Sequence, residues 1–167
     1  LHVIGKDILR FHAIYWPAFL LAAKIDPPKR VFGHGWILSG DEKMSKSKGN
    51  ILNPIEIIDT YGIDELRYYL MKEVPHGNDG NISLKNLETC INSDLANNYG
   101  NLCQRIFSFV KNNCKDNIIE IKKVSESDKK ILDETKILTK NLRDEMNNQN
   151  LNNYLKTVIN VSFLTNK

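Results

Sequence analysis

The sequence has few cysteines, and none of them form a close pair. Cys90, Cys103 and Cys114 are its three cysteines, and no Cys-x-x-Cys spacing occurs among them. Structural zinc sites in proteins commonly use such pairs, so the pattern argues against a zinc site in this segment. An odd number of widely spaced thiols also gives no disulfide framework and suits a reducing, cytoplasmic setting. We therefore expect free thiols that behave as small apolar side chains.

Long apolar runs and a strong charge excess are also missing. The most hydrophobic stretch, residues 14–23, is too short to cross a bilayer, so we expect no membrane partner. The formal net charge is only +3, which favours a local basic site over a surface that coats nucleic acid. The 167 residues suit one or two compact domains. Because the chain begins with Leu1, we expect an internal piece of a longer polypeptide.

A lysine-rich stretch stands out at residues 43–50. Lys43-Met44-Ser45-Lys46-Ser47 interleaves lysine with serine, and Gly49 follows shortly after. Lysine is rarely buried unpaired and serine favours turns, so the stretch predicts an exposed, cationic loop. Such a loop can bind polyphosphate, although composition alone favours a solvated surface segment, as most short lysine-rich stretches are.

The pattern of the first 83 residues predicts an α/β unit. We expect a strand at 2–4, a turn at Gly5, a helix capped by Asp7 and interrupted at Pro17, and a second strand over 30–38. Asn53-Pro54 should open a helix that Gly62 ends, and Asp64 should cap the next one. Turn-forming residues fill 73–83, where we place a domain boundary.

The sequence pattern predicts that residues 84–167 are helical. Apolar residues recur at helical spacing from Leu84, Ser125 begins a capping signal, and a further helix opens near Asn150. These helices predict an antiparallel bundle. The expected fold class is thus α/β plus all-α, divided into 1–38, 39–83 and 84–167.

Several motifs together resemble methionyl-tRNA synthetase, a class I aminoacyl-tRNA synthetase. The lysine loop matches the KMSKS signature of that class. Residues 2–8, 33–38 and 61–70 also fit, and the Phe-His-x-x-x-Trp-Pro run at 11–17 favours methionine over related amino acids. The resemblance implies the end of a Rossmann-like catalytic domain over 1–38, a KMSKS region over 39–83 and an incomplete helical anticodon-binding domain over 84–167.

The resemblance assigns roles in adenylation. The implied reaction is ATP-dependent ligation of methionine to tRNA(Met) through methionyl-adenylate, with Mg²⁺ accompanying ATP, in the cytoplasm. Lys43 and Lys46 are the implied catalytic residues, Lys46 being the main contact to the transition state. The implied ATP-binding residues are Gly5, Asp7, His34, Ile37, Lys43, Ser45, Lys46 and Ser47. Without the resemblance, Gly5 could simply turn the chain, Asp7 could simply cap a helix, and His34 would be a structural strand residue.

Two further sets follow from the resemblance. Phe11, His12 and Trp16 match the methionine pocket, where aromatic rings suit a thioether, although in isolation they would be core residues. Asn101 and Arg105 match the anticodon-reading helix and belong to a polar stripe with Asp94 and Asn98 that could otherwise be a solvated helix face.

The family also has a His-x-Gly-His motif that does not occur in this sequence. We therefore expect this segment to be inactive alone. The alternatives are a non-catalytic tRNA-binding module or a related class I synthetase.

Overall fold

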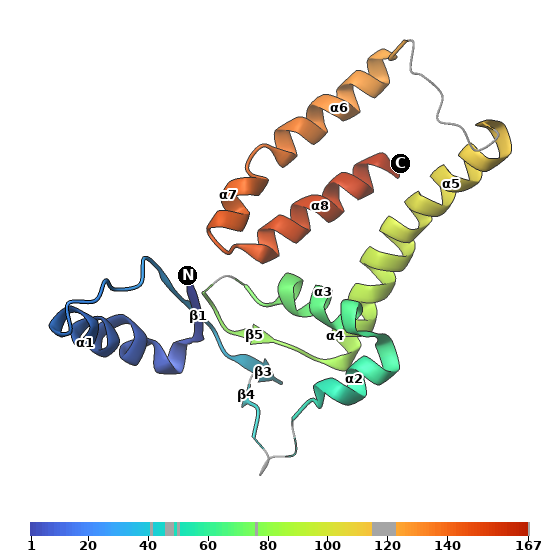
Figure 1. The fold of residues 1–167 in the computed structure, drawn as a ribbon. Helices are drawn as coiled ribbons and strands as arrows, with labels where there is room; N and C mark the ends of the chain where they lie inside the picture. Colours follow the sequence, from blue (N-terminus) through green and yellow to red (C-terminus); the bar gives the residue numbers. More distant parts are fainter. Residues whose placement is uncertain (41, 46–48, 50, 76, 115–122, 167) are drawn as a thin grey trace.

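The structure is a computed structural model, and it describes residues 1–40, 42–45, 49, 51–75, 77–114 and 123–166. Two site candidates, Lys46 and Ser47, therefore lie outside the described residues. The chain runs from a small α/β region through a compact helical centre to a group of longer helices (Figure 1).

Two parallel strands begin the fold. β1 (His2–Gly5) pairs with β2 (Val31–His34), so that Gly5 lies opposite His34 where both strands end. The connecting helical segment changes type twice, from the 3-10 turn η1 (Lys6–Ile8) through the π-helical η2 (Phe11–Tyr15) to α1 (Trp16–Ala22). The interruption expected at Pro17 is therefore a change of helix type. Pro17 stands in the first turn of α1, and it has no N–H to donate to the preceding turn.

The cap predicted for this helical segment is wrong. Gly5, not Asp7, is the N-cap residue of η1, and no side chain caps it. Asp7 instead lies in the first turn, where a carboxylate still interacts favourably with the free N–H groups.

The single strand predicted over 30–38 is two strands in different sheets. β2 ends at His34, and β3 (Ile37–Ser39) begins after Gly35 and Trp36. At Gly35 the chain passes so close to a neighbouring backbone that an added Cβ would lie 1.9 Å from the carbonyl oxygen of Asn78. Hydrophobic patterning could not reveal this crossing because it depends on a residue distant in sequence.

The second sheet has β3 at its centre. β4 (Glu42–Lys43) pairs antiparallel with β3, and β5 (Gly80–Asn81) pairs parallel with β3 on the other side. This sheet holds the start of the lysine loop beside the ends of the first sheet (Figure 1).

The central helices surround the main core. Asn53 caps α2 (Pro54–Tyr61) as predicted, and Gly62, at a φ of 107°, ends it. Gly62 also serves as the N-cap of α3 (Ile63–Glu73), so the predicted cap at Asp64 is wrong. The core joins α2 and α3 to α4 (Leu84–Cys90) across the turn-rich stretch, and its buried members are Ile57, Leu66, Tyr69, Ile82, Leu87 and Cys90.

The C-terminal part is helical in its described residues. A long helix comprises the π-helical η4 (Ile91–Gly100) and α5 (Asn101–Cys114), followed by α6 (Glu126–Thr139), α7 (Leu142–Asn147) and α8 (Leu151–Thr165). The predicted cap of α6 is confirmed, because Ser125 and Asp128 form a reciprocal capping box. α8 packs against α3, η4 and α6. The short α7 was not predicted.

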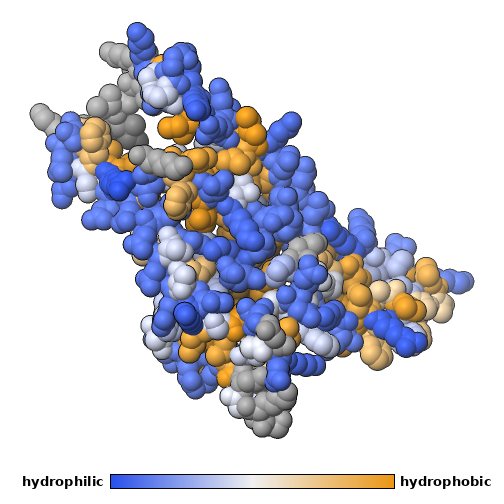
Figure 2. Space-filling view, turned by 180° about the vertical axis from the view of Figure 1, so that it is seen from behind, coloured by the Kyte–Doolittle hydropathy of each residue, from blue (hydrophilic) through white to orange (hydrophobic). Residues whose placement is uncertain are grey.

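Apolar side chains remain exposed at the N-terminal end. Phe11, Phe19 and Leu21 are 59%, 71% and 62% exposed, and the protruding helical segment carries orange side chains in Figure 2. Among the described residues, no helix has both the length and the apolar character needed to cross a membrane.

Candidate active site

The first group of candidates meets at the carboxyl ends of β1 and β2. Gly5 and His34 are opposite each other in the parallel register. Ligands of open α/β sheets bind at such an edge. The Asp7 carboxylate folds back over the turn, since a Cβ added to Gly5 would lie 2.6 Å from Asp7 Oδ1. The His34 Nδ1 lies 2.8 Å from the Gly35 carbonyl oxygen, which can only accept, so Nδ1 carries the proton.

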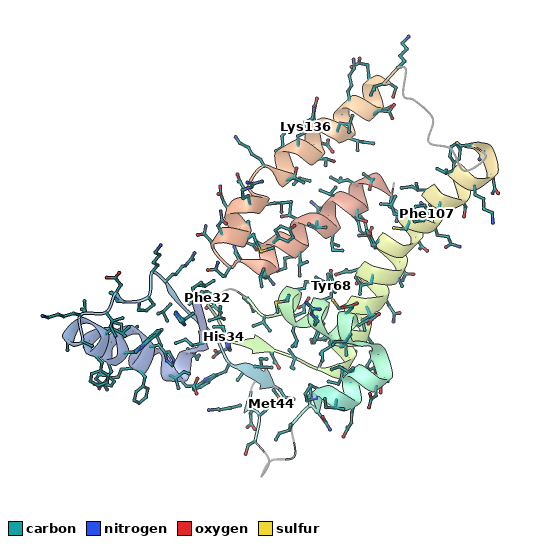
Figure 3. The ribbon with its side chains drawn as sticks, viewed as in Figure 1. Phe32, His34, Met44, Tyr68, Phe107 and Lys136 are labelled. Atoms are coloured by element: carbon teal, nitrogen blue, oxygen red, sulfur yellow. The ribbon has the colours of Figure 1, made fainter. Side chains whose placement is uncertain are left out.

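The start of the lysine loop is fixed next to this edge. Lys43 belongs to β4 and pairs with Leu38, the neighbour of Ile37 on β3. Met44 follows and packs against the central core (Figure 3). Ser45 is half-buried. The sheet therefore holds the backbone of Lys43 in place.

Two lysines of this region contact the Trp36 ring. Lys6 Nζ is 4.5 Å and Lys43 Nζ is 4.4 Å from the centre of the indole ring. Both distances are within the range of a cation–π interaction. Trp36 thus links the turn after β1 to the first lysine of the loop.

Asp79 contacts both Lys6 and Trp36. Its Oδ1 accepts from Lys6 Nζ at 2.5 Å and from the Trp36 backbone N–H at 2.8 Å. The Trp36 carbonyl in turn accepts from the Gly80 N–H at 2.8 Å. The hydrogen bond from Lys6, followed by that from Trp36, lowers the pKa of the Asp79 carboxyl below its usual value. Lys6 is therefore paired with a carboxylate, whereas Lys43 contacts the same ring from β4.

The methionine-pocket candidates separate into two aromatic pairs. The rings of His12 and Trp16 are 6.1 Å apart, and His2 meets Trp16 edge-on at 4.8 Å. Phe11 instead pairs with Tyr15, with ring centres 5.7 Å apart. The structure thus brings His12 and Trp16 together and directs Phe11 to a second pair, whose Tyr15 the sequence interpretation left out.

The polar stripe on η4 and α5 is not a simple solvated face. Asn98 is 2% exposed and donates to the carbonyl of Ile159 on α8 at 3.0 Å. Arg105 donates to the backbone oxygen and to Oδ1 of Asn166, the C-cap of α8, at 3.0 and 2.7 Å. A cation is favourable at this end of a helix. Asn101 donates to its own helix at Asn97.

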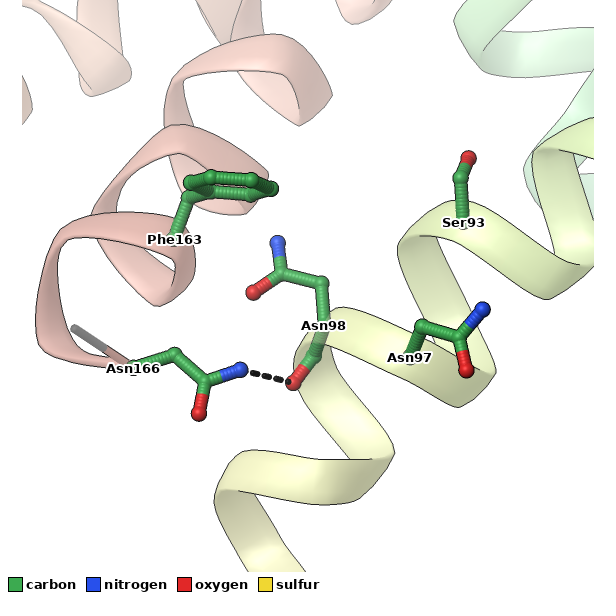
Figure 4. Close-up of a pocket in the computed structure, with 5 residues that line it drawn as sticks. All are labelled: Ser93, Asn97, Asn98, Phe163 and Asn166. Carbon is green, nitrogen blue, oxygen red and sulfur yellow. Dashed lines mark hydrogen bonds between the residues drawn. The ribbon is translucent and has the colours of Figure 1, made fainter.

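A small polar pocket opens beside Asn98 (Figure 4). Its volume is about 270 Å³, and the Asn98 Oδ1 is buried without a hydrogen-bond partner. Asn166 donates to the Asn98 backbone oxygen at 3.2 Å. The pocket is lined by Ser93, Asn97, Asn98, Phe163 and Asn166.

A half-buried polar cluster joins α3 to η4. Lys72 Nζ is 2.5 Å from Asp94 Oδ2, and the Tyr68 hydroxyl donates to the same oxygen at 2.7 Å. Burial acts to raise the pKa of the Asp94 carboxyl, but hydrogen bonds from Lys72, Tyr68 and Ser93 outweigh it and hold the pKa below its usual value. Asp94, which the sequence placed on the stripe, is thus part of a contact between helices.

Comparison with known proteins identifies the class. A profile of the family described as tRNA synthetases class I (M) matches residues 1–107, and the chain belongs to this family. Among curated relatives, the methionine--tRNA ligase of Brucella suis biovar 1 is 49% identical over 150 residues, covering 90% of this chain and 29% of the relative. That of Rickettsia conorii is 58% identical over 114 residues, covering 68% of this chain and 22% of the relative.

Solved structures agree with this assignment. Mycobacterium tuberculosis methionyl-tRNA synthetase in complex with methionyl-adenylate has a TM-score of 0.92 at 41% identity, covering 99% of this chain and 32% of that one. The apo form of the M. tuberculosis enzyme has a TM-score of 0.86 at 36% identity, covering 99% of this chain and 31% of that one. The chain therefore spans about three tenths of the length of these relatives.

Sequence interpretation missed three residues of this site. Trp36 was quoted within a motif without a role, Lys6 was read as part of a turn, and Asp79 was one of many turn formers. The close approach at Gly35, which brings them together, leaves no local signal in the sequence.

Proposed function

We propose that this chain is part of a methionine--tRNA ligase, which forms methionyl-adenylate from ATP and methionine and transfers methionine to tRNA(Met). The observation that carries the proposal is the match to the adenylate-bound M. tuberculosis enzyme across 99% of the chain. The family assignment and the ligase relatives support it, and disfavour the other class I synthetases.

The site geometry supports separate roles in adenylation for two groups of residues, one that binds the nucleoside of ATP and one that binds its phosphates. Gly5, Asp7, His34 and Ile37 bind the nucleoside end of ATP at the edge where β1 and β2 finish. Lys43, Ser45, Lys46 and Ser47 bind the phosphates. Lysine ammonium groups stabilise the charge that develops on the phosphate oxygens as the methionine carboxylate attacks. Because Lys43 stands on β4 beside β3, its charge is delivered to this edge from a fixed backbone position.

Methionine binds near the aromatic pairs at Phe11, His12 and Trp16. The ring edges of His12 and Trp16 provide a polarisable surface suited to a thioether.

Mg²⁺ enters with ATP as its counter-ion. The described residues contain no cluster of three or more His, Cys, Asp or Glu that could hold a metal ion. In ATP-dependent enzymes magnesium is held largely by the phosphates and by water, and we propose the same arrangement here.

The helical part binds the anticodon stem and loop of tRNA(Met). Asn101 and Arg105 are the proposed contacts to unstacked bases, whose free edges suit amide and guanidinium groups. The fixed position of Arg105 on the end of α8 supports this role, since it limits the freedom of a long side chain. In this proposal residues 1–38, 39–83 and 84–167 are catalytic, linking and anticodon-binding parts of a cytoplasmic protein.

The test is methionine-dependent exchange of pyrophosphate into ATP by the full-length polypeptide that carries this segment. We expect exchange with methionine and not with leucine or isoleucine, and none with the 167-residue segment alone. A full-length protein that binds tRNA(Met) without any exchange would instead identify the non-catalytic alternative.

A further inference from the structure

The Trp36 indole ring contacts the side chain of a proposed catalytic lysine. Lys43 Nζ lies 4.4 Å from the ring centre, and hydrogen bonds to Asp79 and from Gly80 fix the backbone of Trp36. The ring therefore projects from a backbone that is tied to the second sheet. It contacts Lys43 at the start of the lysine loop and Lys6 in the turn that follows β1.

A lysine side chain gains much from such a surface. Fixing its rotatable bonds costs conformational entropy, which must be supplied before the ammonium can act on a phosphate. Pairing with Leu38 already holds the backbone of Lys43, so the contact with Trp36 acts on the side chain. A π face near the ammonium reduces the conformational freedom of that side chain.

The second lysine on the ring does not replace Lys43. Lys6 Nζ also lies near the indole, at 4.5 Å, but it is 2.5 Å from the Asp79 carboxylate. The Asp79 carboxylate thus compensates much of the Lys6 charge, and Lys43 approaches the same ring from β4.

We propose that Trp36 is a positioning residue for adenylation, which acts by holding the ammonium group of Lys43 next to the nucleotide-binding edge. The inference rests on the proposed function. Trp36 touches neither reacting group, and its contribution is made entirely through Lys43.

The test compares three variants of the full-length polypeptide in single-turnover formation of methionyl-adenylate. Trp36→Leu removes the π face and should slow the step by roughly 2- to 5-fold, the range of an exposed cation–π contact. Trp36→Phe keeps a π face and should restore most of the rate. Phenylalanine also removes the indole Nε1 donor, which is buried without a partner, so this variant should fold at least as well.

A double-mutant cycle separates positioning from a general structural effect. In a Lys43→Ala background, Trp36→Leu should produce no further slowing, because the residue through which it acts is gone. Equal slowing in both backgrounds, or equal rates for Trp36→Phe and Trp36→Leu, would overturn the inference. Absence of methionine-dependent exchange in the unmodified full-length protein would instead overturn the proposed function itself.

Discussion

Replacing Asp94 by asparagine should loosen the contact between α3 and η4. Asparagine has nearly the same shape and can still accept the hydrogen bond from Tyr68, so the change removes little except the negative charge. The Lys72 ammonium, whose side chain is 17% exposed, would then lack its closest carboxylate, which lies 2.5 Å away.

The expected size follows from the surroundings of Lys72. Removing one partner of a buried ion pair costs about 3–5 kcal/mol. Here Glu73 Oε1 remains 3.3 Å from the ammonium and compensates part of its charge. We therefore expect a loss of about 2 kcal/mol in the free energy of local opening, a roughly 30-fold rise in the open population.

Hydrogen exchange measured by mass spectrometry on the full-length protein is the suitable assay, because it reports α3 and η4 separately from other parts. Asp64→Asn is the matched control, since Asp64 makes an exposed ion pair with Arg67 at 3.7 Å that is worth little. Similar exchange in both variants would refute the view that the Asp94 cluster joins the two helices.

Three further predictions concern single sites. Gly35→Ala should abolish most adenylation, because its Cβ would overlap the Asn78 backbone and displace Trp36. Gly33→Ala should not, because its Cβ would meet only the Leu9 side chain, at 3.4 Å; equal pyrophosphate-exchange activities in the two variants would contradict this. At pH 8, iodoacetamide should label Cys103 before Cys90, because burial raises the pKa of the Cys90 thiol to about 11; peptide mapping decides the order, and early labelling of Cys90 would be the contrary result. The pKa of Asp94 is lower in the folded than in the unfolded chain, so the stability that this carboxylate contributes is complete above about pH 4 and is lost as the pH falls through the folded pKa. Hydrogen exchange of α3 and η4, corrected for intrinsic rates, should show this loss in the unmodified protein and not in Asp94→Asn.

Local signals in the sequence accounted for much of the fold. Asn53 and Ser125 were identified as caps because a short polar side chain before an apolar run has a direct hydrogen-bonding consequence. The end of α2 at Gly62 followed from the same kind of reasoning. Both caps placed on aspartate were wrong, since at Asp7 and Asp64 the preceding glycine already occupies the N-cap position.

Features set by distant residues were not predictable. The break between β2 and β3 depends on the approach of Asn78 to Gly35. The same crossing brings the Trp36 N–H to Asp79, which lies 43 residues further along the chain. Likewise, the sequence pattern predicted that the polar stripe forms one helix face, but Asp94 forms an ion pair with α3 and Asn98 donates a hydrogen bond to α8. Helical periodicity identifies a polar face and does not tell which neighbour covers it.

The candidate site shows the same division. The lysine motif located the loop, and the turn after the first strand located Gly5, because these signals are local. His34 was assigned from the family resemblance, since the sequence pattern placed it inside a single strand over 30–38. The contact of Lys43 with Trp36 needs the pairing of β3 with β4, and the fixing of Trp36 needs β5. Lys46 and Ser47 remain predictions from the motif.

The central claim is that Lys43 supplies positive charge to ATP during methionine activation. Single-turnover formation of methionyl-adenylate by the full-length polypeptide tests it, with Lys43→Ala compared with Lys29→Ala, a control that removes an equal charge from an exposed site. The account predicts on the order of 100-fold slowing for Lys43→Ala with little change in ATP affinity, and near-normal rates for Lys29→Ala. An unchanged rate in Lys43→Ala, or equal slowing in both variants, would contradict the account.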